Sequence, residues 1–462
     1  MHVLYVHQNY PAQFGHIAHH LAEHHGHRCT FVSETPAGPA GPEANPIEKI
    51  QYRRLGGATA KNHFCSRTFE NNVWHCDGVF RALAARPDLE PDLIVGHSGF
   101  GSTLMLRELY PAVPVLNFFE YYYLPHDEHS DMDFRHDLRA LGWEAGVWKY
   151  QRSRCRNAMI LLDLQNCQLG YCPTAFQRSR FPDEYAAKLG TCFDGIDRTL
   201  WHAHDDALRP PPGQRTDRTF ANVTVAADEK LVTYVSRGFE SMRGFDQFMK
   251  AARRILERDP KVRILAVGTE KTAYGGDETH TGGRTFKQWT LDLPELRDAD
   301  LSRLHFVGRL EPTDLATLLA ASDLHVYLTV PFVLSWSMVN AMSCGAVVLG
   351  SDTPPVRELI EHNVTGLLAD FFDPDALAET ALEALSDLPA HRHLGRAAER
   401  RVAEGYALDV VLPRMLDLYA RCRATTAGLE APRGRPVVPP VQKAPPPRQA
   451  AQQQTRRGFF AG

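Results

Sequence analysis

The sequence has no apolar run that approaches the roughly 18 to 20 residues a membrane-spanning helix requires. Its first residues also lack a basic segment followed by an apolar one, so we expect no signal peptide and a cytoplasmic protein. None of the nine cysteines forms a Cys-x-x-Cys pair, and an odd number cannot all pair within one chain. The thiols are therefore expected to be free, as in a reducing compartment.

The sequence also has little excess charge of either sign. It contains 51 Lys and Arg against 55 Asp and Glu, a formal net charge of −4. A balance of this kind gives no broad positive field, so no nucleic-acid partner is expected. No Asp-x-Asp motif stands at the end of a suitable predicted strand, and we therefore expect neither a metal ion nor another cofactor.

The chain is long enough for two domains, since 462 residues exceed what one hydrophobic core usually supports. Short apolar runs alternate with amphipathic segments, a pattern that predicts βαβ units and parallel sheets, and hence an α/β fold. The strands predicted in the first half are Val3–Val6, Cys29–Val32, Leu93–Val95, Val115–Phe118 and Met159–Leu162.

The pattern weakens over residues 200–227, which we interpret as the domain junction, and then restarts. A helix is predicted from about Phe245 to Arg258, because its apolar residues fall on one face. Residues 269–303 form a long excursion of the kind that is often functional. The strands predicted in this half are Leu231–Val235, Ile264–Val267, Leu304–Val307, Leu324–Leu328 and Val347–Leu349.

Two blocks of sequence point to a phosphate-bearing ligand, and a third places a histidine at the end of a strand. In the first, a strand ends near Thr329 and a helix begins near Ser335–Ser337, so that free N–H groups could bind a diphosphate. In the second, a strand leads into a glycine-containing turn with Arg237 and Arg243, which can bind phosphate oxygens. In the third, a strand delivers His97 to its carboxyl end.

These blocks, in this order, resemble the family 4 (group 1) retaining glycosyltransferases of the GT-B fold, over roughly residues 1–425. The turn Asp194-Gly195-Ile196-Asp197 resembles the family's Asn-Gly-Val/Ile-Asp signature. Glu358 and Gly366 match its usual ending after the donor-binding helix. The run from Tyr327 to Gly345 resembles a bacterial subgroup with a Pro-Phe-Val-Leu-Ser-Trp-Ser signature. The resemblance implies two Rossmann-like domains whose parallel sheets face a central cleft.

The resemblance also implies roles for single residues. Arg237 would stabilise the donor diphosphate, together with Arg243 at the position of the family's usual lysine. His97 would lie near the transferred sugar, and Ser335, Trp336 and Ser337 would meet the donor sugar and phosphates. Glu358 would sit in the nucleotide part of the site. Gly15 lies where the family often has a glycine-rich loop near donor and acceptor.

One departure from the family concerns its pair of glutamates, which are separated by seven residues. The corresponding positions hold Phe332 and Asn340. Phe332 agrees with the subgroup signature. Asn340 can still hydrogen-bond a ribose hydroxyl, but as a neutral group it would bind less strongly than a carboxylate.

Other interpretations of these residues stay open. Arg237 and Arg243 could form surface ion pairs, and His97 could be an ordinary core histidine. Glu120 and Tyr122 follow a strand and could face the acceptor, or the aromatic residues there could only pack. Trp336 could pack between the domains rather than touch the sugar. A group of histidines could suggest a metal, but it resembles one face and the end of a helix, without a closed ligand set; its members are His16, His19, His20, His24, His25 and His27.

The boundaries we predict are an acceptor domain over 1–205 and a donor domain over 206–405. A helix over 406–428 would pack back on the first domain. A disordered basic tail rich in Pro and Gln would cover 429–462, and it could make a peripheral contact with an anionic membrane surface.

The function expected from the resemblance is metal-independent transfer of a sugar from a nucleotide-diphosphate donor to a glycan or lipid-linked acceptor, with retention of anomeric configuration. Two alternatives stay open at this point. One is a sugar-nucleotide 2-epimerase on the same fold. The other is a sugar-nucleotide-binding module without activity, which the asparagine at position 340 suggests.

Overall fold

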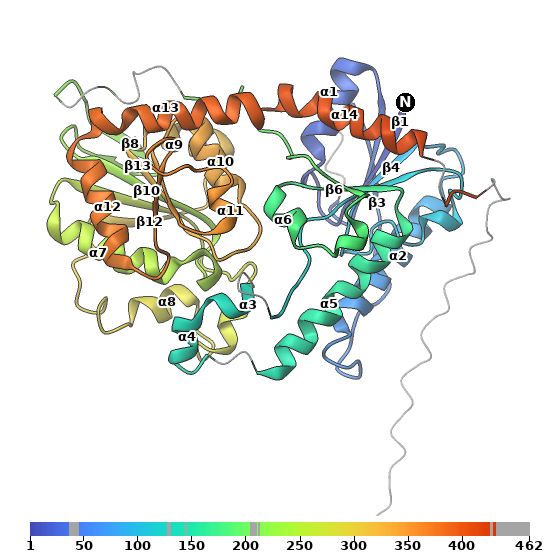
Figure 1. The fold of residues 1–462 in the computed structure, drawn as a ribbon, viewed down its shortest axis with the longest axis horizontal. Coiled ribbons are helices and arrows are strands. Elements are labelled where there is room, and N and C mark those ends of the chain that lie inside the picture. The colour runs from blue at the N-terminus through green and yellow to red at the C-terminus, as the bar shows by residue number, and fades with distance from the viewer. Residues whose placement is uncertain are drawn as a thin grey trace, which may run out of the picture.

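The computed structural model describes residues 1–36, 46–126, 131–143, 146–203, 210, 213–425 and 428–430. Two large parallel sheets, one from each half of the chain, are each covered by helices on both faces (Figure 1). The predicted α/β class with two parallel sheets is therefore confirmed. The predicted tail lies outside the described residues from residue 431 onward.

The N-terminal sheet has seven strands in the order β3-β2-β1-β4-β5-β6-β7, and all neighbours are parallel. Along β1, Val3 and Tyr5 enter one apolar cluster while Leu4 and Val6 enter another, because successive side chains of a strand point to opposite faces. The strands are β1 (His2–Val6), β2 (Arg28–Ser33), β3 (Ile47–Gln51), β4 (Leu93–His97), β5 (Val115–Phe118), β6 (Leu169–Cys172) and β7 (Leu189–Thr191).

Helices from distant parts of the sequence cover the two faces of this sheet. Helices α1 (Gly15–His25) and α14 (Leu408–Ala424) contribute to the cluster that contains Tyr5. Helices α2 (Arg67–Ala84) and α5 (Val147–Asn166) contribute to the cluster on the opposite face. Both faces of the sheet are thus buried, as is usual for parallel sheets.

The strand predicted at Met159–Leu162 is wrong, because these residues lie inside α5. A short apolar run does not by itself distinguish a strand from a buried stretch of helix. Met159, Ile160 and Leu164 are buried on one side of this 20-residue helix. The next strand is β6, which begins at Leu169, beyond the end of α5.

The C-terminal sheet has six parallel strands in the order β12-β11-β10-β13-β14-β15. Helices α7 (Phe245–Arg258) and α12 (Pro374–Ser386) contribute to the apolar cluster on one face, and α7 has the bounds predicted from its apolar periodicity. The strands are β10 (Lys230–Gly238), β11 (Val262–Thr269), β12 (Leu304–Gly308), β13 (Leu324–Tyr327), β14 (Val348–Ser351) and β15 (Leu367–Ala369).

The stretch interpreted as a junction holds more structure than expected. An antiparallel hairpin, β8 (Arg218–Phe220) and β9 (Val223–Val225), lies within it, and Val225 is buried in an apolar cluster of the C-terminal domain. The excursion over 269–303 contains α8 (Phe286–Leu291). The other helices are α3 (Asp131–Phe134), α4 (His136–Ala140), α6 (Ala175–Ser179), α9 (Pro312–Ala321), α10 (Trp336–Ser343), α11 (Pro354–Arg357) and α13 (Leu388–Gly405).

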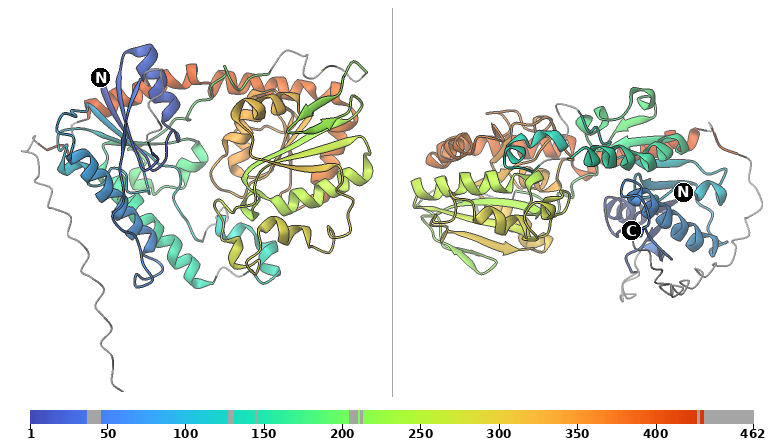
Figure 2. Two further views of the ribbon diagram at one scale, coloured as in Figure 1. Left: turned by 180° about the vertical axis from the view of Figure 1, so that it is seen from behind. Right: turned by 90° about the horizontal axis from the view of Figure 1, so that it is seen from below.

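The two domains are joined through the last two helices. Helix α13 lies on the C-terminal domain, and α14 continues across to the N-terminal sheet, as the two views of Figure 2 show together. There the hydroxyls of Tyr5 and Tyr419 are 3.2 Å apart and hydrogen-bonded. Among the described residues, no helix is long and apolar enough to cross a membrane.

We expect the packing of α14 to contribute strongly to stability. Met415 is fully buried in the cluster that contains Tyr5. Replacing Met415 with Ala should lower the free energy of unfolding by about 2–5 kcal/mol, because the substitution leaves a cavity. Asp417→Ala, which removes an exposed ion pair with Arg421, should change it by less than about 1 kcal/mol. Equal losses in denaturant titrations would contradict this packing.

Candidate functional site

His97 stands at the carboxyl end of β4 and is only 2% exposed. Its Nδ1 lies 2.8 Å from the carbonyl oxygen of Ser98, which can only accept, so Nδ1 carries the proton. Burial, together with the nearby His7, holds the pKa of His97 well below its usual range. The ring is therefore neutral, and its Nε2 is a hydrogen-bond acceptor with no partner among the described residues.

Glu120 lies just beyond the carboxyl end of the neighbouring strand β5. Its Oε2 is 3.8 Å from Nε2 of His97. Burial raises the pKa of Glu120 to about 6, although the charges of Arg243 and Arg237 act in the opposite direction. His97 and Glu120, two hydrogen-bond acceptors at the ends of adjacent strands, thus lie close together. The positive charges of two arginines of the other domain stabilise the ionised form of Glu120.

A buried carboxyl group holds the turn that follows His97. Asp163 on α5 accepts hydrogen bonds from the hydroxyl of Ser98 at 2.9 Å and from the amide of Gly99 at 3.0 Å. Burial raises the pKa of Asp163 to about 7. Sequence reasoning passed over Asp163, since an isolated Asp inside an apolar run has no local signature.

Arg237 and Arg243 lie at the carboxyl end of β10, but their environments differ. The Arg237 side chain is exposed, and it makes no hydrogen bond or ion pair with any described residue. Arg243 is buried, and its guanidinium donates to the hydroxyl of Thr329 at 2.7 Å and to the carbonyl of Val333 at 3.1 Å. Arg237 is thus available to a ligand, whereas Arg243 also holds the loop before α10.

Helix α10 begins at the place predicted from the sequence. The hydroxyl of Ser335 caps it by accepting from the amide of Ser337, and it lies 2.9 Å from the Ser337 hydroxyl. Trp336 donates its indole N–H across the domain boundary to Asp194 at 2.8 Å. Burial raises the pKa of Asp194 to about 7, while this hydrogen bond lowers it.

Asn340 lies one turn into α10 and is 6% exposed. Its side-chain oxygen is buried and has no hydrogen-bond partner among the described residues. A buried acceptor left unpaired costs free energy, typically about 1–3 kcal/mol. The position therefore favours a ligand group that donates a hydrogen bond.

Glu358, predicted in the nucleotide part of the site, contacts the N-terminal domain in this structure. Its carboxylate accepts from the amides of Ala175 and Phe176 at 2.8 and 2.9 Å, at the start of α6. This contact across the boundary was not anticipated from the sequence, because the partners are backbone groups more than 180 residues away.

The aromatic residues after β5 divide between the two domains. Tyr122 packs against Phe181 of the N-terminal domain, with ring centroids 5.5 Å apart, and it is not brought together with the other candidates. Tyr121 instead reaches the C-terminal domain, where its hydroxyl donates to the carbonyl of Pro331 and its ring contacts Phe332. Tyr121 therefore supports the loop before α10, which is the packing role considered for the aromatic residues of this stretch.

Gly15 begins α1 and is packed too closely for any other residue. A Cβ atom there would lie 2.3 Å from Cβ of Pro11. The position thus has a structural reason for glycine, and its predicted contact with the donor stays a prediction.

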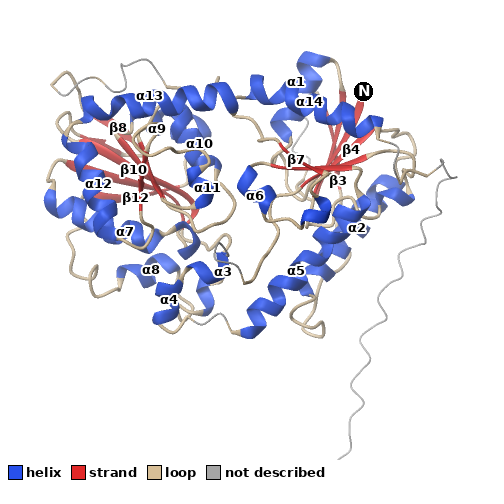
Figure 3. Cartoon of the chain, viewed as in Figure 1, coloured by secondary structure: helices blue, strands red, loops and turns tan. Residues whose placement is uncertain are grey.

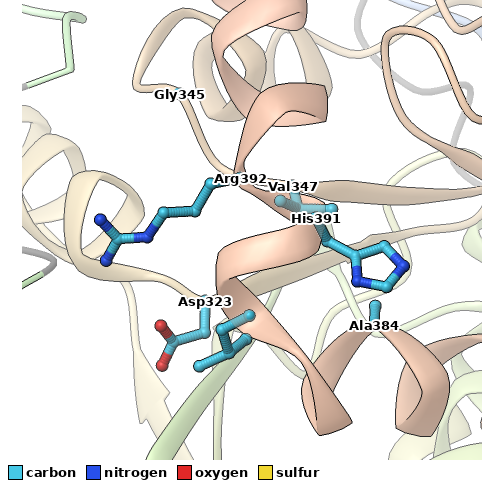
Figure 4. A pocket seen from close by; sticks show the side chains of 7 residues that line it. Asp323, Gly345, Val347, Ala384, His391 and Arg392 are labelled. Carbon is cyan, nitrogen blue, oxygen red and sulfur yellow. The ribbon is translucent and has the colours of Figure 1, made fainter. Parts of the chain in front are cut away.

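The structure brings most of the candidates to one boundary between the domains. The N-terminal domain contributes His97, Glu120 and Asp194, and the C-terminal domain contributes Arg237 and the start of α10. A separate pocket lies at the opposite, amino ends of β13 and β14 (Figure 4). It is lined by Asp323, Gly345, Val347, Ala384, Leu388, His391 and Arg392. In the described part of the chain, no three His, Cys, Asp or Glu side chains are grouped so as to hold a metal.

Comparison with known protein families shows which family has this architecture. Residues 25–200 match the family described as Glycosyl transferase family 4 group, and residues 216–401 match Glycosyl transferases group 1. The chain belongs to the family 4, group 1 glycosyltransferases. Its fold is GT-B, as predicted. The finer resemblance to a subgroup with the Pro-Phe-Val-Leu-Ser-Trp-Ser signature stays a prediction.

Individual relatives are distant. N-acetyl-alpha-D-glucosaminyl L-malate synthase of Bacillus anthracis is 25% identical over 195 residues, which is 42% of this chain and 46% of that protein. Alpha-maltose-1-phosphate synthase of Mycobacterium tuberculosis is 23% identical over 234 residues, 49% of this chain and 55% of that protein. The chain spans about half the length of these curated relatives.

Two solved structures have the same fold. Sucrose-phosphate synthase from Thermosynechococcus elongatus superposes with a TM-score of 0.65 at 19% identity, covering 92% of this chain and 99% of that one. HepE of Anabaena, solved in complex with UDP and glucose, gives 0.61 at 16% identity, covering 91% and 100%.

We predict that the free energy lost with the hydrogen bond between Trp336 and Asp194 depends on pH. Because the folded-state pKa of about 7 is raised above the usual value near 3.8, stability contributed by protonated Asp194 is lost as pH rises from about 4 to about 7, and the loss levels off above 7. Trp336→Phe removes the donor that lowers this pKa. It should therefore cost about 1 kcal/mol more at about pH 8 than at about pH 5, in denaturant titrations.

Trp148→Phe is the control, because Trp148 is largely exposed and lies on α5. This variant should show no such difference between the two pH values. If Trp336→Phe lowers the free energy of unfolding equally at both pH values, the assigned hydrogen bond is contradicted.

Proposed function

We propose that this protein transfers a sugar from a nucleotide-diphosphate donor to a glycan or lipid-linked acceptor, with retention of anomeric configuration and without a metal ion. One observation carries the proposal. Glu120 lies beside His97 at the edge of one sheet. The positive charges of Arg237 and Arg243, at the edge of the other sheet, lower the pKa of its carboxyl group. Groups suited to a sugar hydroxyl and to a diphosphate therefore face each other across the domain boundary.

The cations account for stabilisation of the leaving group. When the bond from sugar to phosphate breaks, negative charge accumulates on the nucleoside diphosphate. Arg237 has an exposed guanidinium with no protein partner among the described residues, so it can bind phosphate oxygens through two N–H groups. Arg243 adds a fixed positive charge, and the start of α10 adds the positive end of a helix dipole.

Asn340 supports a nucleotide at the same place. Its buried, unpaired side-chain oxygen can accept from a ribose hydroxyl, the role that the resemblance gives to this position. The observation supports binding of a nucleotide, which a module without activity would also bind. It also leaves open the 2-epimerase, which would bind the same donor.

His97 and Glu120 would act on hydroxyl groups. Because Nε2 of the neutral His97 and the Glu120 carboxylate both accept, each can take one hydrogen bond from a different hydroxyl group of the ligands. Glu120 can also take up the proton that the acceptor hydroxyl loses, since its pKa of about 6 is close to neutral. We assign His97 to the donor sugar and Glu120 to the acceptor.

The donor can be identified by its effect on thermal stability. A ligand that binds only the folded state raises Tm in proportion to its occupancy. A panel of nucleoside diphosphates and sugar nucleotides should contain a selective stabiliser, and UDP is tested first because the HepE structure contains it. Arg237→Ala should weaken binding of that ligand about tenfold or more, because a charge-assisted contact is lost.

Arg396→Ala serves as the control, since Arg396 is an exposed arginine on α13 of the same domain. It should leave the Tm shift unchanged. If no member of the panel raises the Tm of the wild-type protein, the proposed function is wrong. If a donor does bind, its consumption with and without acceptor distinguishes the two enzymes. A transferase consumes the donor only when an acceptor is present, whereas an epimerase needs no acceptor.

The pH dependence of transfer tests the role of Glu120. A carboxyl group must be ionised to accept a proton, so kcat/KM should fall as pH decreases through about 6, the pKa of Glu120. Glu120→Gln should lower kcat and remove this inflection. A low-pH inflection that persists in the variant would show that another group titrates.

A further inference from the structure

One segment of the N-terminal half makes its contacts in the other domain. Residues 131–143, here called the bridging segment, lie in sequence between β5 and α5, yet α3 and α4 sit beside α7 and α8 (Figure 3). Phe134 contacts Phe372 at 4.8 Å between ring centroids, and Trp143 stacks on His280 at 4.9 Å. These contacts belong to the apolar cluster of the C-terminal domain.

At the centre of the bridging segment is a buried charge network. Arg135 is 7% exposed and donates two hydrogen bonds to Asp246, which is 2% exposed, at 2.5 and 3.1 Å. It also donates two to Asp137 at 2.8 and 2.9 Å. Because a buried arginine left unpaired is costly, the network fixes the position of the guanidinium closely.

The remaining hydrogen bond of Arg135 reaches the turn that carries the candidate diphosphate ligands. The guanidinium donates to the carbonyl of Ser241 at 2.6 Å. Ser241 begins a single 3-10 turn that ends at Arg243. On the other side, Asp277 accepts from the amide and the hydroxyl of Ser241 at 2.9 and 2.6 Å. The backbone of this turn is thus held from two directions.

We propose that Arg135 is a positioning residue for the diphosphate site, acting through Ser241 on the turn between Arg237 and Arg243. It does not itself touch the ligand. Arg135 precedes the C-terminal domain in the sequence but makes these contacts within that domain. The inference rests on the proposed function only in taking a nucleoside diphosphate as the ligand.

Hydrogen exchange of the protein without ligand tests the positioning directly. Arg135→Ala should speed exchange of the amides of residues 241–245, since the Ser241 carbonyl, which also accepts from the amide of Gly244, loses its fixed position. The matched control is Arg215→Ala, which also removes a buried arginine with two hydrogen bonds to one carboxylate, that of Asp323. That pair lies at the amino end of β13, away from the turn.

Binding of UDP, or of whichever nucleoside diphosphate the panel selects, is the second measurement. Arg135→Ala should raise Kd about tenfold, whereas Arg215→Ala should leave it within about twofold even though both variants lose stability. Arg135→Lys should recover part of the affinity, because it keeps the charge but not the fork of donors.

Unchanged exchange at 241–245 in Arg135→Ala, or equal acceleration there in Arg215→Ala, would overturn the proposal. So would equal changes of Kd in the two alanine variants. If the wild-type protein binds no nucleoside diphosphate, the proposed function fails, and the exchange measurement still decides whether Arg135 positions the turn.

Discussion

The parallel direction of the strands in both large sheets is the constraint on which the rest of the structure depends. All neighbouring strands in the sheets of seven and six are parallel, so the carboxyl ends of each sheet lie along one edge. His97 and Glu120 follow two neighbouring strands at one such edge, and Arg237 stands at the other. Ligands of open α/β sheets bind at these edges, and here two of them meet.

The meeting of the edges is stabilised by polar contacts that reach across the boundary. Trp336 donates to Asp194, Tyr121 donates to the carbonyl of Pro331, and Glu358 binds the first amides of α6. Several of these groups are buried, and buried polar groups specify geometry because they are costly when unpaired. The contacts therefore determine which residues of one domain lie opposite which residues of the other. Tyr121 and α14 add apolar packing to the same arrangement.

Nine of the ten strands predicted from local apolar patterns are present in the structure, but such patterns record none of the contacts between elements. The helix over Phe245–Arg258 was predicted with its observed bounds, because its apolar residues repeat with the helical period. The run Met159–Leu162 was misassigned, since four apolar residues fit a strand and a buried helix equally well. Arg135, 106 residues before Ser241, was not noticed at all, because no local pattern records a partner so far along the chain.

The central claim is that a nucleoside diphosphate binds between the two sheet edges, and a crystal structure with UDP, or with the nucleotide that stabilises the protein most, tests it most directly. The account predicts that the diphosphate lies within hydrogen-bond distance of the Arg237 guanidinium and next to the start of α10. A diphosphate bound elsewhere, for example in the pocket lined by Asp323 and Arg392, with Arg237 still free, would contradict it.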